Sequence, residues 1–372
     1  CAHRNQSSAR HRVKIGRKNG LEFESTPCRT LYAFAKSQQS FCYECLVVWF
    51  PTTPPSYTTV DILEEGDVPI LLSLPQMKNL YMTIHLTPQS EYLTSEAFGL
   101  NYEKPAAAYT IDNLKRINDS TAVAADRQLT LQQLKNWKSQ FALDEKPKLV
   151  FVCVSGGGKR AALWTLSTLQ LADSLSNGKL IKHTVLLTGA SGGLIGASYF
   201  RELVHRKNSG ESVNPYYAIH REKIASDNLN PLIFSLLAND LFVGLTKFDY
   251  AGKSYHRDRA FTFEDQLNKI TEGYMDKPLS AYRDIELSGK VPMLLLSPTI
   301  INDGRKLYIA SRPVSFLNEE MNSLPDYANI KLGGVDFNRL FAEHDAENLR
   351  FLSALRMSAT FPYITPNTTL PT

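Results

Sequence analysis

The chain has 372 residues, of which 43% are hydrophobic, and its formal net charge is +4. This length fits one large domain, or a domain with an appendage, and the apolar fraction is that of a globular protein. The excess of 41 basic over 37 acidic residues is too small to indicate a nucleic-acid-binding protein. It is compatible with contact to an anionic membrane surface.

No apolar run reaches the roughly 18–20 residues that span a bilayer. The best candidate, residues 68–86, is interrupted by Pro75 and Lys78. The first residues do not form a secretory signal, and Cys1 is compatible with a lipid-modified terminus or with the arbitrary start of a fragment. The sequence leaves the location open and allows peripheral attachment to a membrane.

The five cysteines are too sparse for a disulfide scaffold, and their number is odd. Cys42 and Cys45 form a single C-x-x-C pair, which is half of a zinc site or a redox pair. No second pair and no H-x-x-x-H motif follows it in the sequence. We therefore expect no bound metal.

The chain divides into two parts near residue 146. Residues 1–145 begin with a basic, polar stretch (1–30) that we interpret as a tail, followed by a strand-like stretch at 30–50 and irregular structure over 51–110. An amphipathic pattern at 113–141 predicts a helix. This part has no group of residues that indicates chemistry, and we expect it to pack against the rest.

Residues 146–372 have the pattern of an α/β domain. A continuous apolar run at 148–154 predicts a strand covered on both faces, and a helix follows at 160–175. A second strand at 183–187 and a helix at 193–206 repeat the unit. Consecutive units of this kind imply a parallel sheet with right-handed crossovers. We predict an α/β fold, with a central, largely parallel sheet and helices on both faces.

The remainder of this domain is predicted to be mixed. Residues 210–285 are mostly helical and polar in pattern, and a hairpin follows over 291–311, with its turn at Asn302-Asp303-Gly304. A last helix is predicted at 346–358, with Asp345 as its N-cap.

Ser191 is the candidate nucleophile. It stands in Gly189-Ala190-Ser191-Gly192-Gly193, a Gly-x-Ser-x-Gly elbow between a predicted strand and a predicted helix. Such an elbow exposes a serine hydroxyl on a tight, crowded turn, which requires small neighbours. The alternative interpretation is a serine that only caps the following helix.

The preceding strand ends in a second glycine-rich turn. Gly156, Gly157 and Gly158 are costly in backbone entropy, which indicates a close approach of the backbone to a ligand. We predict that these three residues form an oxyanion hole, with the N–H groups of Gly157 and Gly158 as donors. Arg160, and less strongly Lys159, is a candidate to bind a substrate phosphate at the helix start.

Two nucleotide-binding motifs fail on inspection. A P-loop needs Ser or Thr where Arg160 follows Lys159, and glycine where Cys153 stands. A dehydrogenase-type loop would need glycine at Ile195. We expect no organic cofactor.

A serine nucleophile needs a base. Among the eight histidines, only His256 and His344 are placed where a triad histidine could stand, and neither lies in a distinctive motif. A Ser-His-Asp esterase of the α/β-hydrolase type is therefore an alternative. A non-catalytic lipid-binding or scaffold protein is a second one.

The Gly156–Arg160 turn, followed closely by the Ser191 elbow, resembles the patatin-like phospholipases. The Ser-Gly-Gly-Gly-x-Arg-Ala motif at residues 155–161 is also similar to that of cytosolic phospholipase A2. Residues 353–362 look like the family's helix and proline segment, so the resemblance covers about residue 146 to the C-terminus.

This resemblance implies a three-layer α/β/α fold and a serine hydrolase acting on lipid acyl esters, with transient contact to a membrane surface. It also implies a Ser–Asp dyad, whose Asp lies in an Asp-Gly pair after Pro362. The sequence has no Asp after Asp345, and its only Asp-Gly pair is Asp303-Gly304 in the predicted turn. We therefore expect the chain to be a C-terminally incomplete piece whose dyad Asp lies beyond Thr372. The acyl chain, the headgroup and the oligomeric state are not predicted.

Overall fold

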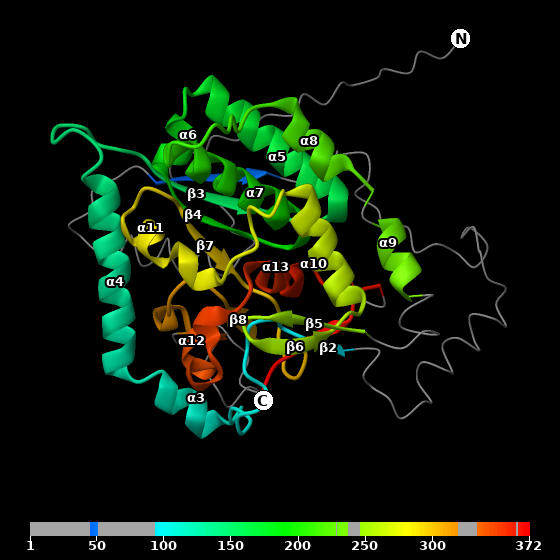
Figure 1. Cartoon of the computed structure of the whole chain (residues 1–372). Coiled ribbons are helices and arrows are strands. Elements are labelled where there is room, and N and C mark those ends of the chain that lie inside the picture. Colours follow the sequence, from blue (N-terminus) through cyan, green and yellow to red (C-terminus); the bar gives the residue numbers. More distant parts are fainter. Residues whose placement is uncertain (1–44, 51–93, 228, 237–245, 319–332, 362–363) are drawn as a thin grey trace, which may run out of the picture.

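The computed structural model describes residues 45–50, 94–227, 229–236, 246–318, 333–361 and 364–372 (Figure 1). The predicted tail, Cys42 of the C-x-x-C pair, and residues 51–93 of the predicted irregular stretch lie outside these ranges.

Within the described residues, the main sheet has four strands in the order β1-β3-β4-β7. They are β1 (Cys45–Phe50), β3 (Leu149–Val154), β4 (Thr184–Gly189) and β7 (Met293–Leu296). All neighbouring strands are parallel. Every residue of β3 is buried, as its unbroken apolar sequence requires for a strand with both faces covered. The predicted α/β fold with a parallel sheet is confirmed.

Helices pack against both faces of this sheet. On one face, Val150 and Val152 pack in one apolar cluster with Leu166 of α5 (Gly158–Leu175) and with residues of α7 (Ser191–Asn208). On the other face, Phe151 packs with Trp137 of α4 (Ser120–Lys138). Figure 1 shows α4 along one side of the molecule, apart from α5 and α7. Residues on both sides of position 146 thus contribute to the packing around the sheet.

The helix predicted at 113–141 is two helices, α3 (Ile111–Ile117) and α4. The break occurs at Asp119, whose carboxylate accepts hydrogen bonds from the N–H groups of Thr121 and Ala122 and so caps α4. Besides α7, the described residues within 179–287 form the helices α6 (Lys179–His183), α8 (Ala218–Ala225), α9 (Leu229–Phe234), α10 (Arg259–Ile270), η4 (Leu279–Tyr282) and α11 (Arg283–Leu287).

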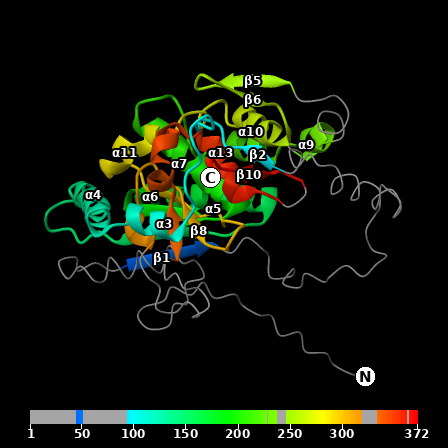
Figure 2. The same cartoon turned by 90° about the horizontal axis from the view of Figure 1, so that it is seen from below.

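The region predicted to be mostly helical also contains an antiparallel hairpin, β5 (Lys247–Tyr250) and β6 (Lys253–His256). Its two-residue turn holds Ala251 and Gly252 at positive φ, the conformation that hairpin turns of this length need. Figure 2 shows this hairpin and β1 at opposite sides of the molecule.

The hairpin predicted after β7 is present. The N–H of Ile300 donates to the carbonyl of Arg305 at 2.8 Å, and β8 (Lys306–Tyr308) then pairs in parallel with β9 (Gly334–Asp336). The remaining elements are β2 (Thr94–Glu96), η5 (Ser315–Asn318), α12 (Phe337–Leu340), η6 (Ala342–His344), η7 (Ala346–Asn348), α13 (Phe351–Ala359) and β10 (Asn367–Thr369), and β10 pairs in parallel with β2.

The predicted N-cap at Asp345 is wrong. Residues 346–348 form a 3-10 turn, and α13 begins only at Phe351. Asp345 has a left-handed backbone (φ 58°), and its carboxylate pairs with the Lys253 ammonium at 2.8 Å. The ion pair to a distant strand occupies the side chain that capping would have used.

Across the described part of the chain, every helix is either too short or too polar to traverse a lipid bilayer.

Candidate active site

The two glycine-rich turns lie side by side at one edge of the main sheet. Val154, the last residue of β3, pairs with Gly189, the last residue of β4. The N–H of Ala190 donates to the Val154 carbonyl at 3.1 Å. Because β3 and β4 are parallel, the segments that follow them leave the sheet at the same edge, and α5 and α7 start there (Figure 1).

Ser191 occupies a strained position at the first turn of α7. Its φ is +51°, in the left-handed region that costs a residue with a side chain about 1–2 kcal/mol. The N-cap of α7 is Ala190, and no side chain caps the helix. The interpretation of Ser191 as a helix cap is therefore wrong. Strain of this kind persists only where the surrounding structure enforces it.

The surrounding structure consists of glycines in backbone-to-backbone contact. A Cβ on Gly192 would lie 1.7 Å from the carbonyl oxygen of Gly158, and one on Gly193 would lie 2.2 Å from that of Ser155. A Cβ on Gly156 would lie 3.2 Å from the Ser191 Cβ and 3.9 Å from its hydroxyl oxygen. The first turn therefore contacts the serine, only glycine fits at positions 192 and 193, and a side chain at position 156 would press on the Ser191 side chain.

The N–H groups of the first turn are available for a ligand. Gly157 and Gly158 are exposed, and Gly157 precedes α5 without a side-chain cap. Among the described residues, neither N–H group has a protein acceptor. The N-termini of two 18-residue helices, α5 and α7, meet at this edge. Their dipoles and unpaired N–H groups favour negative charge there.

The two cations at the start of α5 differ in their contacts. The Lys159 ammonium donates a hydrogen bond to the carbonyl of Ser226 at the end of α8. Arg160 is exposed and forms no ion pair within the described ranges. Of the two candidates for binding a substrate phosphate, Arg160 is therefore the one whose charged group has no partner among the described residues.

Of the two candidate histidine bases, one forms a hydrogen bond to another residue and the other lies on the surface. His344 is buried, and its Nε2 donates to the carbonyl of Pro105 at 3.0 Å. His256 is exposed at the end of β6. No side chain in the described residues hydrogen-bonds to the Ser191 hydroxyl. The structure therefore brings Ser191 together with the turn Gly156, Gly157 and Gly158, with Arg160 following on the first turn of α5, and the described histidines make no contact with them.

Asp303 has the structural role that the sequence predicts for it. Its carboxylate accepts a hydrogen bond from the Tyr109 hydroxyl at 2.8 Å and another from the N–H of Arg305 at 3.1 Å. The carboxylate also pairs with the Arg305 guanidinium at 3.3 Å. These bonds hold the turn between β7 and β8.

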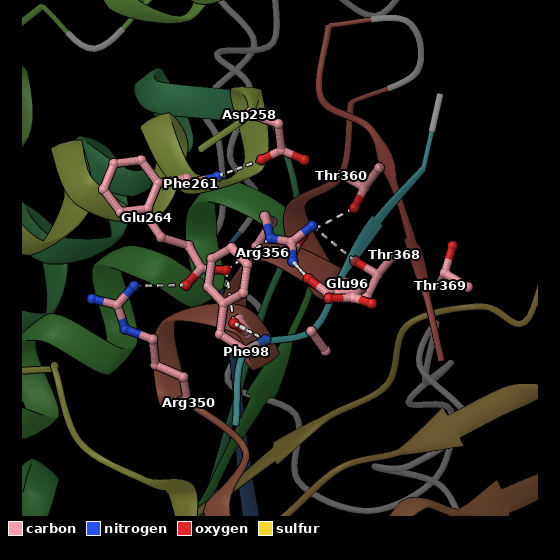
Figure 3. Close-up of polar contacts among 12 residues, drawn as sticks. Glu96, Phe98, Asp258, Phe261, Glu264, Arg350, Arg356, Thr360, Thr368 and Thr369 are labelled. Carbon is pink, nitrogen blue, oxygen red and sulfur yellow. Dashed lines mark hydrogen bonds and ion pairs between the residues drawn. The ribbon is translucent and has the colours of Figure 1, made fainter. Parts of the chain in front are cut away.

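A buried ionic network holds α13, which packs against α7 and α10. Glu264 of α10 and Arg356 of α13 are both fully buried, with Glu264 Oε1 accepting from Arg356 Nε at 2.8 Å (Figure 3). Glu264 also accepts from Ser353 at 2.8 Å and from Arg350 at 3.1 Å. The Nη2 of the Arg356 guanidinium donates to the carbonyl of Glu96 at 2.6 Å. The network ties α13 to α10 and to β2.

Sequence reasoning missed a further close contact behind the site. A Cβ on Gly196 of α7 would lie 2.2 Å from the carbonyl oxygen of Ala162 in α5. Gly192 and Gly196 are four residues apart, on one face of the helix. That spacing of small residues was the available signal for two helices in backbone contact.

Within the described residues, no group of three His, Cys, Asp or Glu side chains could hold a metal ion. In comparisons with known proteins, no family model matches the chain, and no curated protein matches its sequence.

Proposed function

We propose that the protein is a serine hydrolase that cleaves acyl esters of lipids, of the phospholipase A or lysophospholipase kind. The observation that carries the proposal is the strained backbone of Ser191 (φ +51°) on a strand-to-helix turn beneath Gly156. A helix-capping role does not account for that strain, whereas a nucleophile elbow requires it. The resemblance of both turns to the patatin-like phospholipases supports the same activity.

In the proposed reaction, the Ser191 hydroxyl oxygen attacks the ester carbonyl carbon, and its proton passes to the base. The carbonyl oxygen becomes an oxyanion, which the N–H groups of Gly157 and Gly158 stabilise. Collapse of this intermediate expels the alcohol, which takes up the proton, and leaves an acyl-enzyme. Water then attacks the acyl group, releases the fatty acid and restores the hydroxyl.

We propose an Asp in an Asp-Gly pair as the base, as the resemblance implies. The positive ends of α5 and α7 assist by favouring negative charge on both the oxyanion and the serine oxygen. A dyad of this kind needs no histidine, which agrees with the contacts of His344 and with the exposed position of His256.

We further propose that Arg160 binds the phosphate of a phospholipid headgroup. Its guanidinium is exposed beside the oxyanion turn, and a guanidinium can bind a phosphate through two parallel hydrogen bonds. A phospholipid substrate implies transient contact with a membrane surface.

The test measures fatty-acid release from phosphatidylcholine by the protein encoded by the whole gene. We expect Ser191→Ala to abolish release, whereas Ser155→Ala, in the neighbouring turn, retains most of it. His256→Ala should also keep most of the activity, which separates a Ser–Asp dyad from a histidine triad. Release that survives Ser191→Ala would refute the proposal.

A further inference from the structure

The solvent-facing side of α5 is unusually apolar. Trp164, Leu171 and Leu175 have 54%, 61% and 77% of their surface exposed. Spacings of seven and four residues place them on one stripe of the helix. Figure 1 shows α5 at the outer edge of the molecule, above the main sheet.

The exposed charges on α5 and directly after it are positive. The only acidic residue of α5, Asp173, is fully buried. Its carboxylate accepts hydrogen bonds from the N–H of Ile181 and the hydroxyl of Tyr216, both at 2.9 Å. Exposed cations flank the stripe, with Arg160 near its start and Lys179 just after its end. We refer to Trp164, Leu171, Leu175, Arg160 and Lys179 together as the α5 outer face.

The α5 outer face adjoins the candidate active site through the helix itself. Gly158 is the first residue of α5, and Trp164 follows it by six residues, or about 9 Å along the axis. A surface that covers Trp164 therefore lies next to the mouth of the oxyanion turn.

We propose that the α5 outer face docks on an anionic lipid bilayer. Tryptophan and leucine enter the boundary between headgroups and acyl chains, and lysine and arginine beside them pair with anionic headgroups. A second copy of the chain fits less well, because two such faces would bring cations against cations. The inference rests on the proposed lipid substrate for its purpose, but docking requires no catalysis and can be measured without it.

The experiment uses the Ser191→Ala protein, which cannot consume the vesicles. Vesicles of equal parts phosphatidylglycerol and phosphatidylcholine should bind it, and vesicles of phosphatidylcholine alone should bind it weakly. Leu171→Ser/Leu175→Ser should lower binding to the anionic vesicles about tenfold. The matched control is Leu129→Ser/Leu143→Ser, at exposed leucines on and just after α4, which should bind as the parent does.

Tryptophan fluorescence gives a second readout. Docking should shift the emission to shorter wavelength, and Trp164→Phe should remove this shift while keeping most of the binding. The proposal is overturned if the parent does not bind anionic vesicles, or if the α5 and α4 double variants bind equally. It is also overturned if light scattering shows a dimer that Leu171→Ser/Leu175→Ser dissociates, because the face would then belong to a second copy. When the same surface substitutions are made in the protein that keeps Ser191, a fluorophosphonate should label it as it labels the wild type. Failure of docking is therefore distinguishable from failure of the hydrolase proposal.

Discussion

Ser191 is held in a conformation that most residues avoid, and the glycines around it explain how. Gly192 and Gly193 allow α7 to begin against the backbone of the preceding turn, and Gly156 leaves space above the hydroxyl. The strain in the serine is maintained by packing that tolerates no added carbon at Gly192 or Gly193. Adding a single methyl group next to Ser191 should therefore change the reactivity of Ser191 more than it changes the fold.

Gly156→Ala tests this at the smallest scale. The new methyl group would lie 3.2 Å from the Ser191 Cβ and 3.9 Å from its hydroxyl oxygen. We expect the rate of Ser191 acylation to fall at least about tenfold, because a small displacement of a reacting group is costly in rate. Denaturant unfolding of the same variant is the control for folding, because Gly156 does not have a positive φ and its added Cβ meets only the Ser191 side chain and the Ala190 carbonyl oxygen, at 3.2 Å or more. Equal acylation rates in Gly156→Ala and the wild type would contradict the proposed placement.

Arg160→Gln tests the proposed phosphate contact. The substitution removes an exposed charge, so the fold should be unaffected. KM for a phospholipid should rise about tenfold, with kcat and the hydrolysis of an uncharged ester unchanged. Lys135→Gln, at an exposed lysine of α4 outside the α5 outer face, is the matched control for loss of general positive charge. A similar rise in KM for both variants would remove the specific role of Arg160.

At the scale of elements, helices α5, α7 and α13 form the body that supports the site. Gly196 lets α7 contact the backbone of α5, and α13 is anchored by Glu264 and Arg356. A buried ion pair needs all its partners, because removing one leaves an uncompensated charge away from water.

Arg356→Met should therefore lower the free energy of unfolding by about 3–5 kcal/mol. The side chain is fully buried, and its loss leaves Glu264 paired only with Arg350 and Ser353. Lys269→Met, on α10 with Glu264, is the control, because Lys269 is mostly exposed and its i,i+4 pair with Asp265 contributes about 0.3–0.5 kcal/mol. Denaturant unfolding of the two variants measures the difference. A cost for Arg356→Met no larger than the control's would contradict a structural role for the network.

The sequence was informative where local pattern and structure coincide. The apolar run of β3, the elbow at Ser191 and the turn at Asp303 were predicted because each is encoded within about ten neighbouring residues. Contacts between distant segments have no such signal. Glu264 and Arg356 are 92 residues apart, and Asp345 was predicted as a cap because its pairing with Lys253 is invisible locally. The β5–β6 hairpin was missed because its turn is Ala-Gly rather than Asn-Gly.

At the scale of the whole molecule, a buried histidine makes stability depend on pH. His220 links α7 to α8: its Nδ1 accepts from the Tyr199 hydroxyl at 3.0 Å, and its Nε2 donates to the carbonyl of Asn214 at 3.0 Å. Burial lowers the pKa of His220 below its ordinary value of 6.5. The hydrogen bond to Asn214 and the charge of Glu272 oppose this shift, and the charge of Lys223 adds to it. The folded protein therefore protonates this imidazole at a lower pH than the unfolded chain does.

Below about pH 6.5 the His220 imidazole is protonated to a larger extent in the unfolded chain than in the folded chain. The free energy of unfolding should therefore fall as the pH drops further. His220→Gln removes this titration, and the slope of unfolding free energy between about pH 8 and 5 should become shallower. Part of the slope should remain, because burial also lowers the pKa of His205. Chemical denaturation across this pH range measures it, and an unchanged slope in the variant would contradict the assignment.

The central claim is that Ser191 is an activated nucleophile, and a fluorophosphonate probe tests it most directly. The protein encoded by the whole gene is treated with the probe, digested and analysed by mass spectrometry. We predict a single labelled serine at position 191, labelling that Ser191→Ala abolishes, and unchanged labelling in Ser155→Ala. A folded protein that takes up no probe at Ser191, or that is labelled equally after Ser191→Ala, would contradict the account.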